Sequence, residues 1–123
     1  MLESDAYMAV ACLAFIVGDY ATGFFKAACK NDISSTKLRE GLYHKLGFIG
    51  ALALAYGCQI VTNWGYMPPS FNVVFAGVAV YILIVEAVSI FENLCEISPE
   101  LANSPLASLL QVNGKKESDD EQR

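Results

Sequence analysis

Three long apolar stretches of this 123-residue chain contain neither lysine nor arginine, and charged residues make up only 17% of the sequence. The chain also has a single histidine, and none of its four cysteines form a Cys-x-x-Cys pair. It has no glycine-rich phosphate loop, no nucleophile elbow and no cluster with metal-ligand spacing. These absences leave no residues to carry catalysis. We therefore expect a protein that is not an enzyme and that has no cofactor, no metal site and no nucleic-acid partner.

The apolar residues are concentrated in three runs, residues 7–25, 46–62 and 71–91. A helix rises ~1.5 Å per residue, so each run is about long enough to cross a hydrocarbon core of ~30 Å. The runs use up almost all of the apolar sequence and leave none for a soluble core. The pattern predicts an all-α membrane protein with three transmembrane helices. Residues 1–111 are expected to form this transmembrane domain, and residues 112–123 a polar, disordered cytoplasmic tail.

All eight basic residues lie outside the three runs. Five fall between the first two runs, from Lys26 to Lys45, and three fall in the C-terminal tail, while the second loop, residues 63–70, has no charge. Because lysine and arginine are enriched in cytoplasmic loops, the pattern predicts a multi-pass protein of the bacterial cytoplasmic membrane. Its N-terminus is expected outside and its C-terminus inside. Trp64 and Tyr66 suit the outer interface, where amphipathic rings gather.

Two short interfacial helices are expected beside the spans. Ser34, Ser35 and Thr36 are residues that cap helices, and apolar residues at three- to four-residue spacing follow them, interleaved with charges. This segment predicts a short amphipathic helix on the cytoplasmic surface before the second span. Pro99 and Pro105 bracket a leucine-containing segment that predicts another interfacial helix after the third span.

Two carboxylates interrupt the apolar runs, Asp19 in the first and Glu86 in the third. An ionised carboxylate near the bilayer centre costs roughly 2.5 to 3.5 kcal/mol, so it is seldom left facing lipid and is a candidate for function. Helical spacing places further polar residues on the same sides of these two runs. We predict a polar stripe that lines a pore and consists of Asp19, Thr22, Glu86, Ser89 and Asn93. The alternative is that both acids lie close enough to the inner interface to reach water or to pair with loop lysines.

Small residues recur at three- to four-residue spacing in the first two runs. Such rows let helix backbones approach closely, and close packing replaces the hydrophobic drive that lipid does not supply. Three helices alone can hardly both pack tightly and enclose two carboxylates, so the pattern favours a homo-oligomer. The residues predicted to form these packing surfaces are Ala14, Gly18, Gly47, Gly50, Ala51 and Ala55.

Three segments carry motifs in a fixed order. Residues 18–27 read G-D-Y-A-T-G-F-F-K-A, residues 34–46 contain S-S and then G-L-Y-H-K-L, and residues 86–93 read E-A-V-S-I-F-E-N. They resemble the D-Y-x-T-G-x-x-K-A, S-S-x(n)-G-L-x-x-K-L and E-x-x-S-I-x-E-N motifs of the phage holins grouped with clostridial toxin-release holins. The matching residues are Asp19, Tyr20, Thr22, Gly23, Lys26, Gly41, Lys45, Ser89, Glu92 and Asn93. One departure is that the family carries a glycine between the last motif and the following proline, where residues 94–98 read L-C-E-I-S.

The resemblance runs from about residue 10 to about residue 111 and implies a lysis protein. Such a protein accumulates in the cytoplasmic membrane of the host, assembles, and at a set time opens lesions that release a peptidoglycan hydrolase or a toxin. The partners implied are the lipid bilayer, further copies of the chain and that cargo.

Two functions of other classes stay open. A small oligomeric ion or proton channel, or a transporter, would use Asp19 and Glu86 as a relay, and a membrane anchor would recruit a partner through its cytoplasmic loop. A relay passes only ions and an anchor passes nothing. Release of folded protein therefore distinguishes the lysis protein from both.

Overall fold

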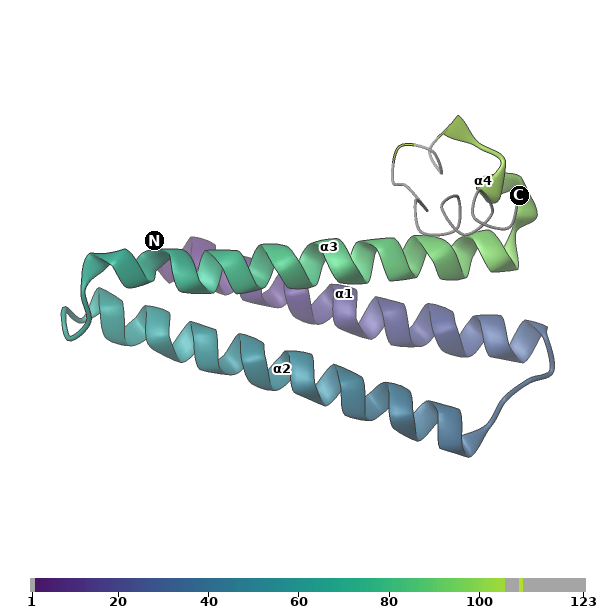
Figure 1. The fold of residues 1–123 in the computed structure, drawn as a ribbon, viewed down its shortest axis with the longest axis horizontal. Coiled ribbons are helices and arrows are strands. Elements are labelled where there is room, and N and C mark those ends of the chain that lie inside the picture. The colour runs from purple at the N-terminus through teal and green to yellow at the C-terminus, as the bar shows by residue number, and fades with distance from the viewer. Residues whose placement is uncertain (1, 106–108, 110–123) are drawn as a thin grey trace, which may run out of the picture.

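The structure is a computed structural model that describes residues 2–105 and 109. It contains three long helices, α1 (Leu2–Cys29), α2 (Ser35–Asn63) and α3 (Asn72–Ile97), which form an elongated bundle (Figure 1). A 3₁₀ turn, η1 (Pro69–Phe71), precedes α3, and a four-residue helix, α4 (Pro99–Ala102), follows it. α1 and α3 run in the same direction and pack against each other, and α2 runs in the opposite direction (Figure 1). The described residues contain no strand.

Each long helix is long enough and apolar enough to cross a membrane. This confirms the predicted all-α class with three membrane-spanning helices. The first two predicted spans, residues 7–25 and 46–62, lie within α1 and α2. The third, residues 71–91, begins at the last residue of η1 and continues in α3. The predicted disordered tail, residues 112–123, lies outside the described residues.

Left-handed residues end the first two helices. Asn31, with φ at 53°, follows α1 and allows the Asp32 N–H to donate to the Ala27 carbonyl at 2.9 Å. Gly65, with φ at 88°, follows α2 in the same way. Such left-handed caps satisfy carbonyls that the helix itself leaves free, and asparagine and glycine are the residues that adopt them at least cost.

The helix predicted at the cytoplasmic surface is present, but it is the first part of α2 and not a separate element. The Ser34 hydroxyl caps it and accepts a hydrogen bond from the Lys37 N–H at 3.4 Å. No proline interrupts the chain from Ser35 to Asn63, and the helix continues without a break into the second span. Lys45 is consequently part of the membrane-crossing helix and not of the loop. After α3 the structure describes α4 at the start of the second predicted interfacial segment. Part of that segment lies outside the described residues.

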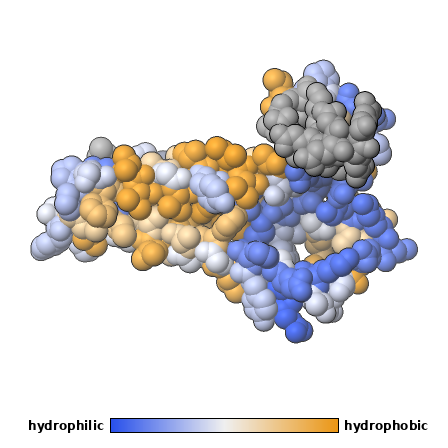
Figure 2. Space-filling model, viewed as in Figure 1, coloured by the Kyte–Doolittle hydropathy of each residue, from blue (hydrophilic) through white to orange (hydrophobic). Residues whose placement is uncertain are grey.

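The bundle has an apolar centre and an apolar outer surface. Its buried apolar core joins all three helices and consists of Cys12, Ile16, Leu52, Ala55, Phe75, Ala79 and Ile82. The Tyr56 ring packs edge-on against Phe75, with the ring centroids 5.4 Å apart. Figure 2 shows that apolar residues cover most of the length of the bundle, as expected for a surface that faces lipid.

The two ends of the bundle differ in chemistry. The basic end holds the α1–α2 connection, residues 30–34, and the C-terminal end of α3, and hydrophilic residues gather there (Figure 2). Lys26 of α1 pairs with Glu96 of α3 at this end, with nitrogen and oxygen 2.8 Å apart. The aromatic end holds the α2–α3 connection, where Trp64 and Tyr66 are exposed.

Candidate functional site

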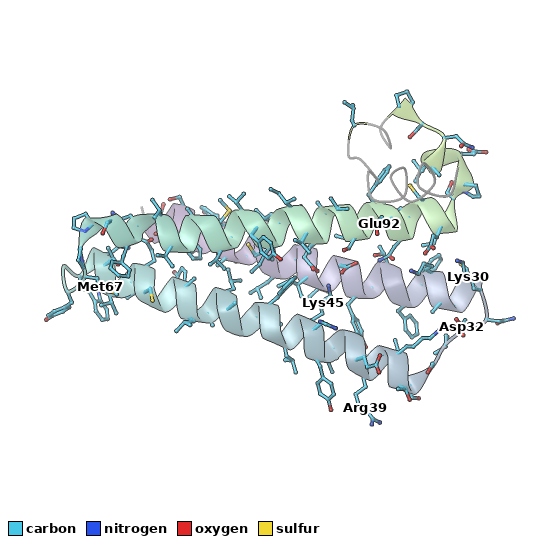
Figure 3. All side chains as sticks on the ribbon, in the orientation of Figure 1. Lys30, Asp32, Arg39, Lys45, Met67 and Glu92 are labelled. Carbon is cyan, nitrogen blue, oxygen red and sulfur yellow. The ribbon has the colours of Figure 1, made fainter. Side chains whose placement is uncertain are left out.

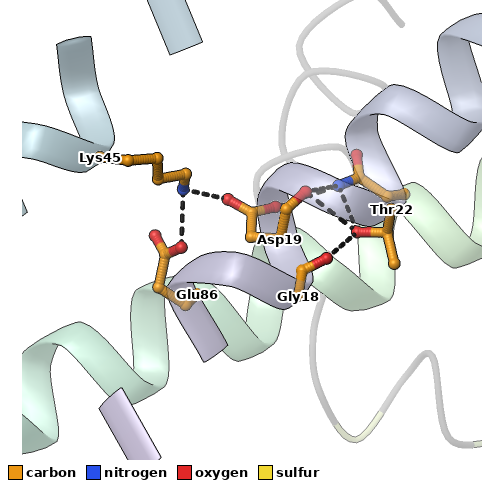
Figure 4. Close-up of polar contacts among 6 residues, drawn as sticks. Gly18, Asp19, Thr22, Lys45 and Glu86 are labelled. Atoms are coloured by element: carbon orange, nitrogen blue, oxygen red, sulfur yellow. Dashed lines mark hydrogen bonds and ion pairs between the residues drawn. The ribbon is translucent and has the colours of Figure 1, made fainter. Parts of the chain in front are cut away.

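Three charged side chains, one from each long helix, meet inside the bundle (Figures 3 and 4). The Lys45 ammonium of α2 donates a hydrogen bond to Glu86 Oε2 of α3 at 2.6 Å and another to Asp19 Oδ2 of α1. The Lys45 and Asp19 side chains are only 13% and 12% exposed, and Glu86 is 1% exposed. We call this cluster the triad. It joins all three spans through one ammonium group.

Helical spacing explains why Lys45 turns inward. Lys45, Leu52 and Gln59 are separated by steps of seven residues, which place them on one side of α2, and Leu52 and Gln59 are buried. Gly41, one turn before Lys45, faces the Tyr20 ring of α1, which would lie 3.7 Å from an added Cβ. That distance is an ordinary van der Waals contact, so α2 lies close to α1 one turn before the lysine that reaches across.

Asn93 and Thr22 hold Asp19 from the side opposite Lys45 (Figure 4). The Asn93 side-chain amide lies 3.0 Å from Asp19 Oδ1, 3.3 Å from the Asp19 carbonyl and 3.0 Å from the Thr22 hydroxyl. The Thr22 hydroxyl is also within hydrogen-bonding distance of the Gly18 carbonyl, at 2.9 Å. The carboxylate of Asp19 therefore receives hydrogen bonds from both α2 and α3.

Four of the five residues predicted for the polar stripe meet in this cluster, and they face one another inside a single chain. Ser89, the fifth, is half-buried on α3, and within the described residues it takes no part in the cluster. Lys45 was predicted to lie in the first loop and was named as a motif residue, but it was not predicted as a member of the polar stripe. The available signal was the seven-residue series of Lys45, Leu52 and Gln59. The pairing of both acids with a lysine corresponds to the alternative that the sequence left open.

The residues predicted for helix packing divide into two groups. Gly18 and Ala55 pack within the chain: an added Cβ on Gly18 would lie 3.3 Å from Ile90, and Ala55 is buried in the core. The others are exposed on the outside of the bundle, namely Ala14, Gly47, Gly50 and Ala51. Nothing lies within 4 Å of a Cβ added to Gly47 or Gly50. Packing between chains through these residues stays a prediction.

Other motif residues surround the triad. The Tyr20 hydroxyl donates a hydrogen bond to the Leu38 carbonyl at 3.3 Å, which ties α1 to the first turn of α2. A Cβ on Gly23 would lie 3.6 Å from the Asn93 side-chain amide. Lys26 pairs with Glu96, as described above, while Glu92 is exposed. The motifs thus gather on the half of the bundle that contains the triad.

A second polar group lies nearer the aromatic end. The buried Gln59 of α2 donates from Nε2 to Asn63 Oδ1 and to Asn72 Oδ1 of α3, both at 3.0 Å. We call these three side chains the amide cluster. The apolar core lies between it and the triad, so the bundle has a charged polar layer and a neutral one.

The triad lets a single chain satisfy the hydrogen bonds of its buried charged groups without water. Within the described residues every buried side-chain nitrogen and oxygen has a hydrogen-bond partner. With all three groups ionised, two carboxylates and one ammonium carry a formal charge of −1. Removing the ammonium would leave two carboxylates without a cation, and the loss of one member of a buried ion pair in this way typically costs ~3–5 kcal/mol. Lys45 is therefore the member of the triad on which the closed arrangement depends most.

A sequence model of the bacteriophage holin family matches residues 1–110 of the chain. No curated protein and no solved structure matches it.

Proposed function

Because this chain belongs to the bacteriophage holin family, whose members are non-enzymatic, pore-forming membrane proteins, we propose that it opens timed lesions in the membrane. The chain is a multi-pass protein of the cytoplasmic membrane. In the proposed function, copies accumulate there, assemble into homo-oligomers and at a set time release a peptidoglycan hydrolase or a toxin.

The triad is the observation that supports this proposal most directly. It pairs three charges from three spans, so a single chain can reside in the bilayer without exposing a carboxylate to lipid. That state is suited to accumulation without damage. The same three groups would be well solvated by water if the spans separated. The bundle thus has one arrangement that excludes water. Its charged groups favour a second arrangement, in which they are hydrated.

Assembly is the step that would favour the hydrated arrangement. In a homo-oligomer, the exposed small residues of α2 bring helices of neighbouring chains together, and α1 and α3 then turn their polar sides toward a shared aqueous space. Asp19, Thr22, Glu86, Ser89 and Asn93 line that space in the proposed open state.

The proposed orientation follows the basic residues. The basic end faces the cytoplasm, the aromatic end faces outward, and the N-terminus lies outside. In this arrangement residues 1–111 form the membrane domain. Residues 112–123, which carry Lys115, Lys116 and Arg123, remain in the cytoplasm and tune the timing of opening.

The decisive experiment is release of a folded cytoplasmic enzyme of hydrolase size from bacteria that express the chain. Expression should be tolerated at first and then stop respiration abruptly, and lysis should require a co-expressed peptidoglycan hydrolase. Asp19→Asn and Glu86→Gln each remove one negative charge while nearly keeping the size and shape of the side chain. Because the formal charge of the triad then changes from −1 to zero, the closed arrangement gains stability and both variants should delay release.

Depolarisation without protein release would contradict the large lesion. It would favour the second candidate, a small ion or proton channel, for which the presence of two carboxylates and a lysine within the spans is the specific support. In that case Asp19→Asn and Glu86→Gln should alter ion or proton flux in vesicles. Release of enzyme with unchanged timing in both variants would support the large lesion but would show that the triad does not control when it opens.

A further inference from the structure

We propose that the outward side of α2 at the basic end binds the phosphate of an anionic phospholipid through Arg39. This inference concerns a lipid partner for the first turns of α2, which precede Gly47, Gly50 and Ala51, the residues that the proposed assembly uses. It holds for either orientation of the chain, because it depends only on the composition of the leaflet that the basic end contacts.

Arg39 differs from the other basic side chains of the described residues. Lys26 and Lys30 pair with Glu96, Lys37 pairs with Asp32, and Lys45 belongs to the triad. Arg39 is exposed and has no ion-pair partner among the described residues. In Figure 3 it points away from the bundle, whereas Lys45 points into it. The protein therefore presents one guanidinium group that no carboxylate of its described part neutralises.

The surroundings of Arg39 are those of a lipid-facing interface. Leu42, Tyr43 and Leu46 follow it at three-, four- and seven-residue spacing, which places all four residues on the outward side of α2. The three apolar side chains are 46%, 62% and 52% exposed, respectively. A soluble partner would leave part of this side in contact with acyl chains, while a phospholipid covers both the guanidinium and the apolar residues. Glu40 comes next in sequence but lies about 100° around the helix.

The depth of Arg39 matches the headgroup layer. It precedes Asn63, the last residue of α2, by 24 positions, which at ~1.5 Å per residue is about 36 Å. The hydrocarbon core is ~30 Å thick and the bilayer with its headgroups ~40–45 Å. With Asn63 and the neighbouring Trp64 at the opposite interface, Arg39 reaches the phosphates while Leu46, about 25 Å from Asn63, stays among acyl chains.

The chemistry of arginine selects an anionic lipid. Its planar guanidinium donates two parallel hydrogen bonds to a phosphate, which a lysine ammonium does not do. In a zwitterionic lipid such as phosphatidylcholine the choline cation competes for the same phosphate. Phosphatidylglycerol has no such cation, so we expect Arg39 to prefer it.

A tryptophan reporter tests the proposal at this site alone. The chain has a single tryptophan, Trp64, at the aromatic end, so a Trp64→Phe, Tyr43→Trp background places the only indole beside Arg39. The full-length protein is reconstituted in phosphatidylcholine vesicles, and its fluorescence is quenched with brominated phosphatidylglycerol or brominated phosphatidylcholine. The background protein should prefer the anionic lipid. Arg39→Gln should reduce that preference about fivefold, since one basic residue near an anionic surface contributes ~1 kcal/mol.

Lys37→Gln is the matched control, because it also removes one positive charge and lies only two residues from Arg39. Unlike Arg39, Lys37 is already paired with Asp32. It should leave the preference unchanged. An equal loss in both variants, or no loss in Arg39→Gln, would overturn the proposal. Excess glycerophosphoglycerol, which has the headgroup but no acyl chains, and a polyglutamate peptide should both fail to relieve quenching. Displacement by the first would indicate a site for soluble anions, and displacement by the second a site for an acidic protein, and either result would overturn lipid binding.

Discussion

The triad and the amide cluster are two polar layers of one bundle, and they differ in what they demand of their members. The triad is charged, joins three helices and is almost fully buried. The amide cluster is neutral and joins two helices, and its Asn63 and Asn72 are exposed toward the aromatic end. In the first layer each group depends on the others for the neutralisation of its charge. In the second layer, water and headgroups are within reach of two of the three amides.

The difference indicates how much free energy it costs to separate the helices at each layer. Loss of the lysine leaves two carboxylates buried without a cation, which is strongly unfavourable in a medium of low dielectric, whereas loss of one carboxylate charge leaves a neutral pair. Interhelical hydrogen bonds between neutral groups in membranes are individually modest, averaging ~0.6 kcal/mol. We therefore expect the amide cluster to separate at less cost than the triad, whereas the entry of water changes the energy of the triad most.

Lys45→Met should have the largest effect on the stability of the bundle. Methionine has similar length and helix propensity, but it leaves Asp19 and Glu86 buried together without a cation. The expected loss is ~3–5 kcal/mol. The measurement is the free energy of unfolding in mixed micelles titrated with SDS.

Two comparisons sharpen that result. Lys37→Met makes the same change at the surface, where an exposed ion pair contributes ~0–1 kcal/mol. Combining Lys45→Met with Asp19→Asn and Glu86→Gln removes every charge of the triad and should recover most of the lost stability. If Lys45→Met costs no more than Lys37→Met, the triad does not hold the spans together.

The sequence predicted the three helices well because the signals for membrane spans are local. Runs of apolar residues, the Ser34 cap and the helical spacing of the polar residues of α3 are all read from neighbouring positions. The pairing of the two acids with a lysine was left as an alternative, because that contact depends on how far α2 extends. Charge just before the second run favoured starting the span at Leu46, whereas the continuous helix from Ser35 carries Lys45 into the bundle.

Packing was also only partly predictable. A row of small residues shows that a close contact is affordable on one side of a helix, but it does not say whether the contact lies within the chain or between chains. The structure uses Gly18 and Ala55 internally and leaves Gly47, Gly50 and Ala51 exposed. The sequence alone assigned all of them to one role.

Gln59→Leu in the amide cluster should have a smaller effect than Lys45→Met. It removes both hydrogen bonds that Gln59 donates in the cluster, but the freed amides of Asn63 and Asn72 lie at the exposed end of the bundle and can bond to water. We expect a loss of ~0.5–1.5 kcal/mol in the same SDS titration. A loss equal to that of Lys45→Met would remove the distinction between the two layers.

Leucine at Gly47, Gly50 and Ala51 together should have the smallest effect on a single chain and a large effect on assembly. These residues are exposed, so the added side chains meet lipid and not the core, and the free energy of unfolding should change by less than ~1 kcal/mol. Ala55 is left unchanged because it is buried, and leucine there would disturb the core.

If Gly47, Gly50 and Ala51 form the contact between chains, chemical crosslinking in membranes should shift from long ladders to small species. The matched control is leucine at Ala76 and Gly77, which adds similar bulk to exposed positions on α3 and should leave the ladders intact. Unchanged ladders in the α2 variant would exclude this surface as the contact and transfer the prediction to Ala14 on α1, the exposed small residue that the sequence also favoured.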